Sequence, residues 1–212
     1  MNYTEGCFVG RIWNTAQGGP CLVTIKDNYV YDITSKEIPT IRDLLELNDI
    51  NEYLGRCDSA KLVSAEDLFE TSMQKNSDLF LLAPCDFQAI KACGVTFAKS
   101  MVERVIEERA AGDPKKAESL RNHIGGLIGD SLQNIIAGSQ KANEVKKALI
   151  SEGLWSQYLE VGIGKDAEVF TKAQTLSSVG FGAEVGLNPI SNWNNPEPEI
   201  VLAVNSKGII RG

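Results

Sequence analysis

The first third of the chain contains three short runs of β-branched and aromatic residues, with turn-forming residues between them. The runs cover residues 8–13, 21–25 and 29–33. Gln17-Gly18-Gly19-Pro20 separates the first two runs, and Asp27-Asn28 separates the second from the third. Runs of this length with turn residues between them are typical of consecutive antiparallel strands. The pattern therefore predicts a three-strand meander at the start of the chain.

Helical periodicity replaces this pattern further along the chain. Apolar residues recur at i, i+3 and i+4 in residues 41–47 and again in residues 100–111, which predicts an amphipathic helix in each place. Asp113-Pro114 predicts the start of another helix, because proline fits a first helical turn. A further helix is predicted over residues 143–150, whereas residues 51–76 are polar and ambiguous.

From residue 156 onward the pattern indicates strands again, with glycines between the apolar runs. The predicted fold class is therefore α+β. Within it we expect a small β-rich N-terminal domain over residues 1–80 and a second domain over residues 81–212. The helices between residues 100 and 150 are then an inserted lobe of the second domain.

Acidic residues outnumber basic ones, 28 to 21, and the net charge is -7. A net anion is not attracted to nucleic acid or to anionic membranes without a concentrated basic patch, and the chain has no run of five Lys or Arg. No apolar run approaches the roughly 18 residues that a bilayer requires. The first residues also lack the features of a secretory signal. We therefore expect a cytoplasmic protein that binds neither nucleic acid nor membranes.

The five cysteines are irregularly spaced and include no Cys-x-x-Cys pair, which argues against a disulfide framework and against a zinc site. We expect each of them to be a small buried apolar residue. His123 is the only histidine, so a hydrolytic triad or a His-rich metal site would need groups from another polypeptide. We expect His123 to be a surface residue or a helix cap.

The last residues predict a β-hairpin. Residues 199–204 predict a strand, Asn205-Ser206-Lys207-Gly208 predicts a four-residue turn, and Ile209 begins a returning strand. The second arm has only three or four residues, which leaves backbone groups of its partner unpaired. This pattern predicts that the chain is a fragment or is completed by another segment.

Glu197 and Glu199 lie at the head of this strand, on either side of Pro198. Residues i and i+2 of an extended backbone point to the same face, so we expect both carboxylates in one region of space. Two like charges there would share a proton or bind a cation, and oxygen ligands suit Mg²⁺ or Mn²⁺. The alternative is a pair of solvated glutamates at the start of a strand.

Two further segments carry residues suited to a site. Residues 94–103 run from a strand pattern through a polar turn into a helix, which puts Ser100 near a helix start, where a small anion is favoured. The alternative role of Ser100 is a helix N-cap. Lys172 lies near the end of a predicted strand, and its alternative role is a solvated surface lysine.

In this order, the segments 94–108, 153–160, Lys172 and 193–199 resemble the fumarylacetoacetate hydrolase superfamily. The strings GLWSQYLE at 153–160 and WNNPEPE at 193–199 are much more specific than a Glu-x-Glu pair. Within the superfamily, the chain most resembles bacterial 2-keto-3-deoxy-D-pentonate (xylonate or arabinonate) dehydratases. The resemblance covers residues 80–212 well and the N-terminal part more loosely.

The resemblance implies a fold and a set of site residues. After the N-terminal domain, it implies the start of a mixed β-roll with inserted helices. Glu197 and Glu199 match the family's metal-binding pair, and the third ligand, an aspartate, would lie beyond Gly212. Glu103 matches a glutamate of the family's helix-start pattern, and Ser100 stands where hydrolases of the superfamily have histidine. This difference favours the dehydratase branch over a hydrolase that activates water.

The function implied for the complete protein is that of a Mg²⁺-dependent lyase in pentose catabolism. It would dehydrate a 2-keto-3-deoxy pentonate to 2,5-dioxopentanoate through a metal-stabilised enolate. Glu103 would act as acid or base with Ser100 as a hydrogen-bonding assistant, and Lys172 would hold the substrate carboxylate or the enolate. We expect the 212-residue chain alone to be inactive and the complete protein to form a homo-oligomer.

Two alternatives stay open. The same scaffold also suits a hydrolase or decarboxylase of 3-acylpyruvates. The alternative from another class is a nonenzymatic module that binds a partner. The epimer of the sugar acid is not encoded by any motif, because it depends on the shape of the pocket.

Overall fold

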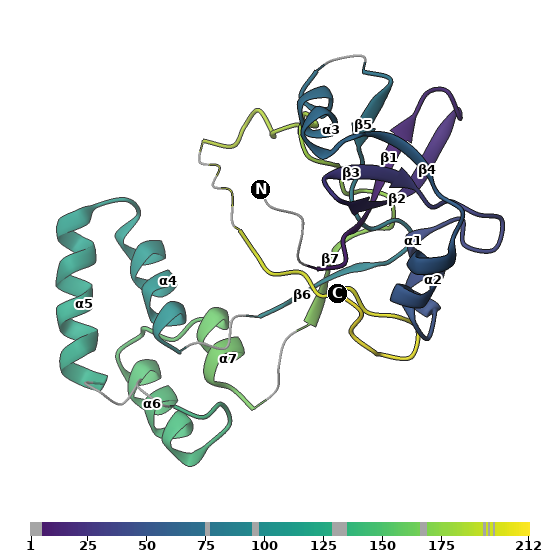
Figure 1. The fold of residues 1–212 in the computed structure, drawn as a ribbon. Coiled ribbons are helices and arrows are strands. Elements are labelled where there is room, and N and C mark those ends of the chain that lie inside the picture. Colours follow the sequence, from purple (N-terminus) through teal and green to yellow (C-terminus); the bar gives the residue numbers. More distant parts are fainter. Residues whose placement is uncertain are drawn as a thin grey trace. The chain divides into compact units, whose positions relative to one another are not determined.

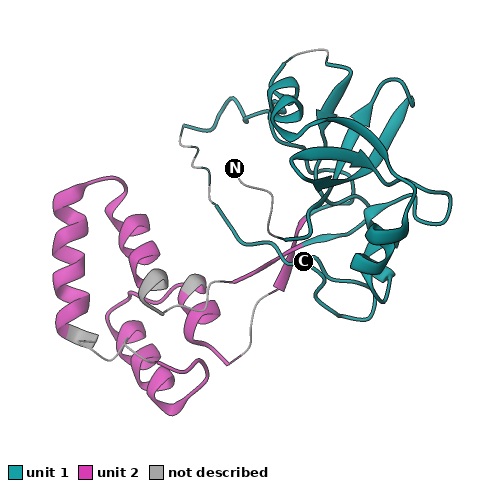
Figure 2. Cartoon of the chain, in the orientation of Figure 1, with its two compact units in different colours: residues 1–90, 173–212 teal, residues 91–172 magenta. Residues whose placement is uncertain are grey.

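The computed structural model describes residues 6–74, 77–94, 98–128, 135–165, 169–192, 194, 196 and 198–212, without the side chains of residues 98–101 and 158. The fold is α+β, as predicted (Figure 1). The chain forms two compact units, one of residues 1–90 with 173–212 and one of residues 91–172 (Figure 2). The two units are defined by contacts between residues and do not test the predicted domain boundary at residue 80, which stays a prediction.

The first unit is built on a five-stranded antiparallel sheet in the order β4-β3-β2-β1-β5. Its strands are β1 (Val9–Asn14), β2 (Gly19–Lys26), β3 (Tyr29–Asp32), β4 (Ala60–Ser64) and β5 (Leu79–Leu81). The first three strands confirm the predicted meander. Asp27 and Asn28 have φ angles of 50° and 62°, and two positive values in succession suit a two-residue turn between twisted strands.

Three short helices complete the regular structure of this unit: α1 (Ile41–Glu46), α2 (Ile50–Arg56) and α3 (Ala65–Ser72). Each follows an N-cap whose side-chain oxygen accepts a hydrogen bond from a backbone N–H three residues later; the caps are Thr40, Asp49 and Ser64. The helix α1 confirms the prediction for residues 41–47. The ambiguous residues 51–76 contain most of α2 together with β4 and α3.

Both faces of the sheet are covered, and β2 supplies side chains to both. Cys21 and Val23 join a cluster with Ile12 of β1 and Leu68 of α3. Leu22 joins the other cluster, whose further buried members are Ile33, Ile38, Ile41, Leu44, Leu45 and Leu54. Successive side chains of a strand point to opposite faces, so covering both faces buries four consecutive residues of β2, 21–24.

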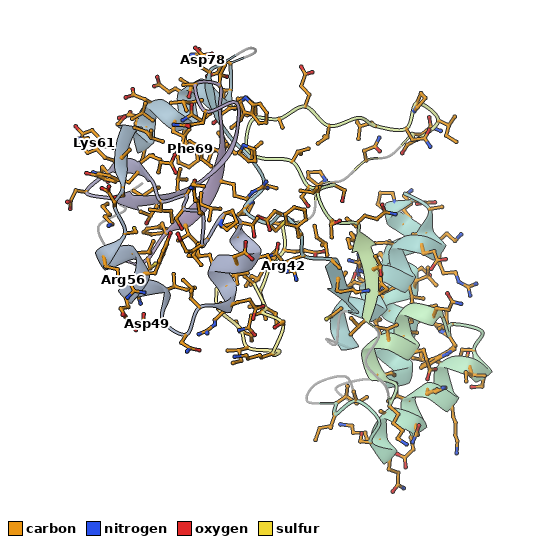
Figure 3. All side chains as sticks on the ribbon, turned by 90° about the vertical axis from the view of Figure 1, so that its right-hand side faces the viewer. Arg42, Asp49, Arg56, Lys61, Phe69 and Asp78 are labelled. Carbon is orange, nitrogen blue, oxygen red and sulfur yellow. The ribbon has the colours of Figure 1, made fainter. Side chains whose placement is uncertain are left out.

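The buried carboxylate of Asp86 connects three parts of this unit. It accepts hydrogen bonds from the backbone N–H of Ile41 at 2.8 Å, of Arg42 at 3.2 Å and of Phe87 at 2.7 Å. The first two belong to the first turn of α1 (Arg42 is labelled in Figure 3), where helical N–H groups have no partner within the helix. Arg11 of β1 lies 3.6 Å from the same carboxylate, so Asp86 joins the sheet to α1.

The second unit is mainly helical. Its helices are α4 (Ala98–Ala110), α5 (Pro114–Ile128), α6 (Gln140–Ser151) and α7 (Gln157–Ile163), and a two-stranded sheet pairs β6 (Ile90–Cys93) with β7 (Val169–Ala173). The helices pack around a buried core of Val102, Val105, Ile106, Ile124, Ala142, Val145, Leu149, Leu154, Leu159 and Ile163. This confirms the helices predicted between residues 100 and 150.

The strand pattern predicted from residue 156 is wrong at its start, because residues 157–163 form α7. Leu159 and Ile163 are spaced by four residues and are 1% and 2% exposed, so both lie on the helix face that packs into the core. Burial of this face against α4 and α6 outweighs the local preference of the segment.

The predicted C-terminal hairpin forms only around its turn. Gly208 has a φ of +75°, and the backbone N–H of Asn205 donates to the carbonyl of Ile209 at 3.0 Å. Val204 and Ile210 form a single β-bridge. Ala203 also exchanges backbone hydrogen bonds with Arg211 and Gly212. Residues 198–202 have no partner strand within the described residues, so the predicted strand over 199–204 does not form.

The prediction that each cysteine is buried is wrong for four of the five. Cys21 is buried, Cys57 and Cys85 are partly buried, and Cys7 and Cys93 are exposed. His123 is at the surface, as predicted, with Nε2 3.4 Å from a carboxylate oxygen of Glu152. None of the helices in the described part of the chain has both the length and the apolar composition of a membrane span.

Candidate functional site

The predicted metal pair can be followed in the structure only at Glu199. This residue is exposed and lies in a segment without regular structure. Glu197 lies outside the described residues. Ile200 and Val201, which follow Glu199, are 93% and 81% exposed, so the backbone here is not held by apolar packing. The carboxylate of Glu199 is therefore accessible to a cation from solvent.

Six and seven residues after Glu199, Asn205 and Ser206 bind the C-terminal end of α1. The backbone N–H of Ser206 donates to one carboxylate oxygen of Glu46 at 2.7 Å, and its hydroxyl donates to the other at 2.9 Å. The side chain of Asn205 is buried and donates to the carbonyl of Leu45 at 3.4 Å. The turn of residues 203–212, here called the C-terminal clasp, is thus fixed to the first unit.

A second contact of the clasp comes from Arg211. Its guanidinium donates to the carbonyls of Leu47 and Asn48, directly after α1. The last carbonyls of a helix have no partner within the helix, so a guanidinium at this place satisfies groups that would otherwise need water. Ala203 packs against the cluster around α1 and α2.

The pKa of Glu46 is lowered by the clasp. The backbone N–H of Ser206 makes the largest contribution, followed by its hydroxyl, and nearby Lys207 and Arg42 act in the same direction. All of these groups favour the charged carboxylate. Glu46 and Ser206 are 160 positions apart in the chain, and the sequence analysis singled out neither.

The predicted acid–base residue Glu103 lies on α4 and is paired with Arg121 of α5. The Arg121 Nε atom is 3.0 Å from one carboxylate oxygen of Glu103 and 3.3 Å from the other. Glu103, helped by Glu118, raises the pKa of Arg121. Both side chains of the pair are about 40% exposed. In this structure Glu103 therefore joins two helices, and proton transfer by its carboxylate would require the pair to open.

The structure gives less detail for Ser100 and Lys172 than for Glu103. Ser100 belongs to the first turn of α4, which begins at Ala98, so Ser100 is not the N-cap residue. It is three positions before Glu103, a spacing that puts two residues on one helix face. Lys172 is exposed on β7, next to Thr171, whose hydroxyl accepts a hydrogen bond from Lys91 at 2.6 Å. Glu199 belongs to the first unit, whereas Ser100, Glu103 and Lys172 belong to the second.

In the described part of the chain, no cluster of three or more Asp, Glu, Cys or His residues could hold a metal ion. Glu197 falls outside that part. Two glutamates would in any case leave a divalent site with fewer protein ligands than the predicted three. The structure shows one accessible carboxylate at the predicted place and leaves the metal site itself a prediction.

Comparisons with family models, with curated proteins and with solved structures found no match to this chain. The resemblance to the fumarylacetoacetate hydrolase superfamily therefore stays a prediction based on sequence motifs.

Proposed function

We propose that this chain is part of a Mg²⁺-dependent hydro-lyase that dehydrates a 2-keto-3-deoxy pentonate to 2,5-dioxopentanoate. The proposal is carried by the Asn-Pro-Glu-Pro-Glu string of residues 195–199, which follows the specific motif at 153–160. The exposed Glu199 carboxylate can reach a cation from solvent, although a solvated glutamate would be exposed in the same way. Mn²⁺ has the same preference for oxygen ligands and is the second candidate ion.

The proposed chemistry follows from the substrate. Glu197 and Glu199 would hold the divalent ion, which would act as a Lewis acid toward the carboxylate and keto oxygens of a 2-keto acid when a proton leaves C3 to form an enolate. The electron pair of the enolate then expels the C4 hydroxyl, which takes up a proton and departs as water. Tautomerisation of the resulting enone converts the C5 alcohol carbon into the aldehyde. The overall reaction releases one water molecule and involves no net oxidation or reduction of the substrate.

Three residues of the second unit have proposed roles in these steps. Glu103 moves the proton, and Ser100 assists it from one helical turn away on α4. Lys172 holds the substrate carboxylate or the developing enolate. Because Arg121 contacts both oxygens of Glu103, the proposal requires that substrate or metal binding releases this carboxylate.

The metal site is tested by titrating the chain with Mn²⁺ and following paramagnetic broadening of its NMR signals. We expect weak binding that broadens residues 198–202 and is lost in Glu199→Gln. The control Glu108→Gln removes an exposed glutamate of α4 and should leave the broadening unchanged. Equal broadening in Glu199→Gln would remove Glu199 from the metal site.

A second candidate function, a nonenzymatic partner-binding module, is favoured by one observation. Ile200, Val201 and Leu202 are 93%, 81% and 57% exposed in consecutive positions. Exposed apolar runs of this kind are typical of surfaces that another segment covers. A turnover assay on the complete protein, with a 2-keto-3-deoxy pentonate and Mg²⁺, separates the two functions: a hydro-lyase should release 2,5-dioxopentanoate, whereas a binding module should not.

A further inference from the structure

The first unit contains a cavity of about 680 Å³ that the proposed reaction does not use. Its walls come from β1 and β5, from the end of α3 and from the segment 176–184, all within one unit. Small-molecule sites have volumes of roughly 300 to 1,000 Å³, so the cavity is large enough for an organic ligand.

One wall of the cavity is a row of rings on the sheet. Pro20 of β2, Trp13 of β1 and Phe80 of β5 are directly opposite one another in the strand register. Residues opposite each other in an antiparallel sheet point to the same face, so the three rings form a row across three strands. The rings of Trp13 and Phe80 are 6.4 Å apart and inclined by 17°. Such a row offers a flat apolar surface for stacking.

Two glycines let the opposite wall lie close to β5 and to the end of α3. A Cβ at Gly180 would lie 2.0 Å from the carbonyl oxygen of Leu81, and a Cβ at Gly182 would lie 2.3 Å from that of Ser72. Gly182 also has a φ of +82°, which L residues rarely adopt. Only glycine fits at these contacts, so the backbone itself fixes the position of this wall.

Large apolar side chains surround the cavity and are not covered by the protein. Met73, Val179 and Phe181 are 63%, 54% and 55% exposed. The Phe181 ring makes an edge contact with Phe69 of α3, labelled in Figure 3, at a centroid distance of 5.3 Å. A ligand in the cavity would bury apolar surface that water now covers, which favours binding.

The positive charge of Arg11 at the cavity is already paired. The guanidinium of Arg11 donates to the carbonyls of Ala83 at 3.2 Å and Cys85 at 2.9 Å, and it lies 3.6 Å from Asp86. Its side chain is only 11% exposed. Glu184, the other charged residue of the lining, also has an interaction partner. Arg11 therefore has no unpaired positive charge to bind an anion, and the Glu184 carboxylate repels one, so the chemistry favours an uncharged ligand over an anionic one.

We propose that the cavity between the Pro20–Trp13–Phe80 row and the segment 176–184 binds an uncharged, planar aromatic small molecule. The ligand stacks on the row and contacts Met73 and Val179 at the rim. Gln74 and Ser178 line the cavity as well and can hydrogen-bond to a polar edge of the ligand. This proposal is independent of the proposed lyase function.

Two fluorescent probes with the same ring system test the charge of the ligand. N-phenyl-1-naphthylamine is uncharged, and 8-anilinonaphthalene-1-sulfonate is the same ring system with a sulfonate. When each probe is titrated into the full chain, the uncharged probe should bind at least about tenfold more tightly than the sulfonate. In the NMR spectrum, the uncharged probe should shift the indole N–H signal of Trp13 but not that of Trp155. Tighter binding of the sulfonate, or no shift at Trp13, would overturn the proposal.

Two matched pairs of variants test the place of binding. Met73→Glu puts a charge at the rim and should weaken binding of the uncharged probe about tenfold, whereas Leu187→Glu alters an equally exposed residue outside the lining and should not. Ser178→Trp narrows the cavity and should weaken binding of the uncharged probe about tenfold, whereas Ser177→Trp, one residue outside the lining, should preserve it. Equal affinities within both pairs would refute the site.

Discussion

At the scale of single residues, the buried carboxylate of Asp86 has the largest structural role that we can assign to one side chain. It is 2% exposed, and it accepts from three backbone N–H groups beside the Arg11 guanidinium. Buried polar groups are stabilising only while they are paired. Removing this carboxylate leaves the N–H groups without an acceptor and Arg11 without its counter-charge.

We therefore expect Asp86→Ala to lower the free energy of unfolding by about 3 kcal/mol, measured by urea denaturation followed by tryptophan fluorescence. The control Asp78→Ala removes an exposed carboxylate (labelled in Figure 3) and should change stability by less than about 0.5 kcal/mol. A similar small change in both variants would show that solvent replaces the contacts of Asp86.

Single residues also show what the sequence could predict of the candidate site. The Glu-Pro-Glu string is local, so its resemblance to a metal pair is visible without a structure. The pairing of Glu103 with Arg121 is not, because it depends on how α4 packs against α5. Trp13 and Phe80 likewise meet only through the register of β1 and β5, with 66 residues between them in the sequence.

At the scale of elements, the C-terminal clasp should respond to acid. The hydrogen bonds from Ser206 lower the pKa of Glu46 in the folded protein. A lowered pKa means that the stabilisation is complete above the usual pKa of a glutamate and is lost as the pH falls through the lowered value. We expect amide exchange at Asn205, Ile209 and Arg211, corrected for intrinsic rates, to accelerate below about pH 4.

Glu46→Gln provides the comparison for this experiment, because it keeps the shape of the side chain and removes its titration. In this variant the corrected exchange rates of the clasp should be higher at neutral pH and should no longer change in acid. Acceleration of the same size in both proteins would assign the acid response to another group.

The helix pair α4–α5 gives a second prediction at this scale. The ion pair between Glu103 and Arg121 is about 40% exposed on both sides, and exposed ion pairs contribute little. Glu103→Gln and Arg121→Ala should each lower the unfolding free energy by less than about 1 kcal/mol, measured by urea denaturation. A loss of several kcal/mol in Glu103→Gln would identify Glu103 as mainly structural and weaken its proposed catalytic role.

Across the whole molecule, the sequence correctly predicted the elements whose ends are marked by their own turn residues or helix caps. The meander and α1 are examples, since turn residues and caps mark their ends. Residues 157–163 and 199–204 were predicted wrongly for one reason: their conformation depends on a partner. The core of the second unit makes the first segment a helix, and residues 199–202 of the second segment have no neighbouring strand among the described residues.

The position of β2 between two apolar clusters has a consequence for the integrity of the first unit. Leu22 anchors the layer of α1 and α2, while its neighbours Cys21 and Val23 anchor the layer of α3. A strand cannot release one of these faces and keep the other in register, because a shift by one residue exchanges them. The two helical layers lie on opposite faces of the sheet, and they therefore unfold together in one cooperative step.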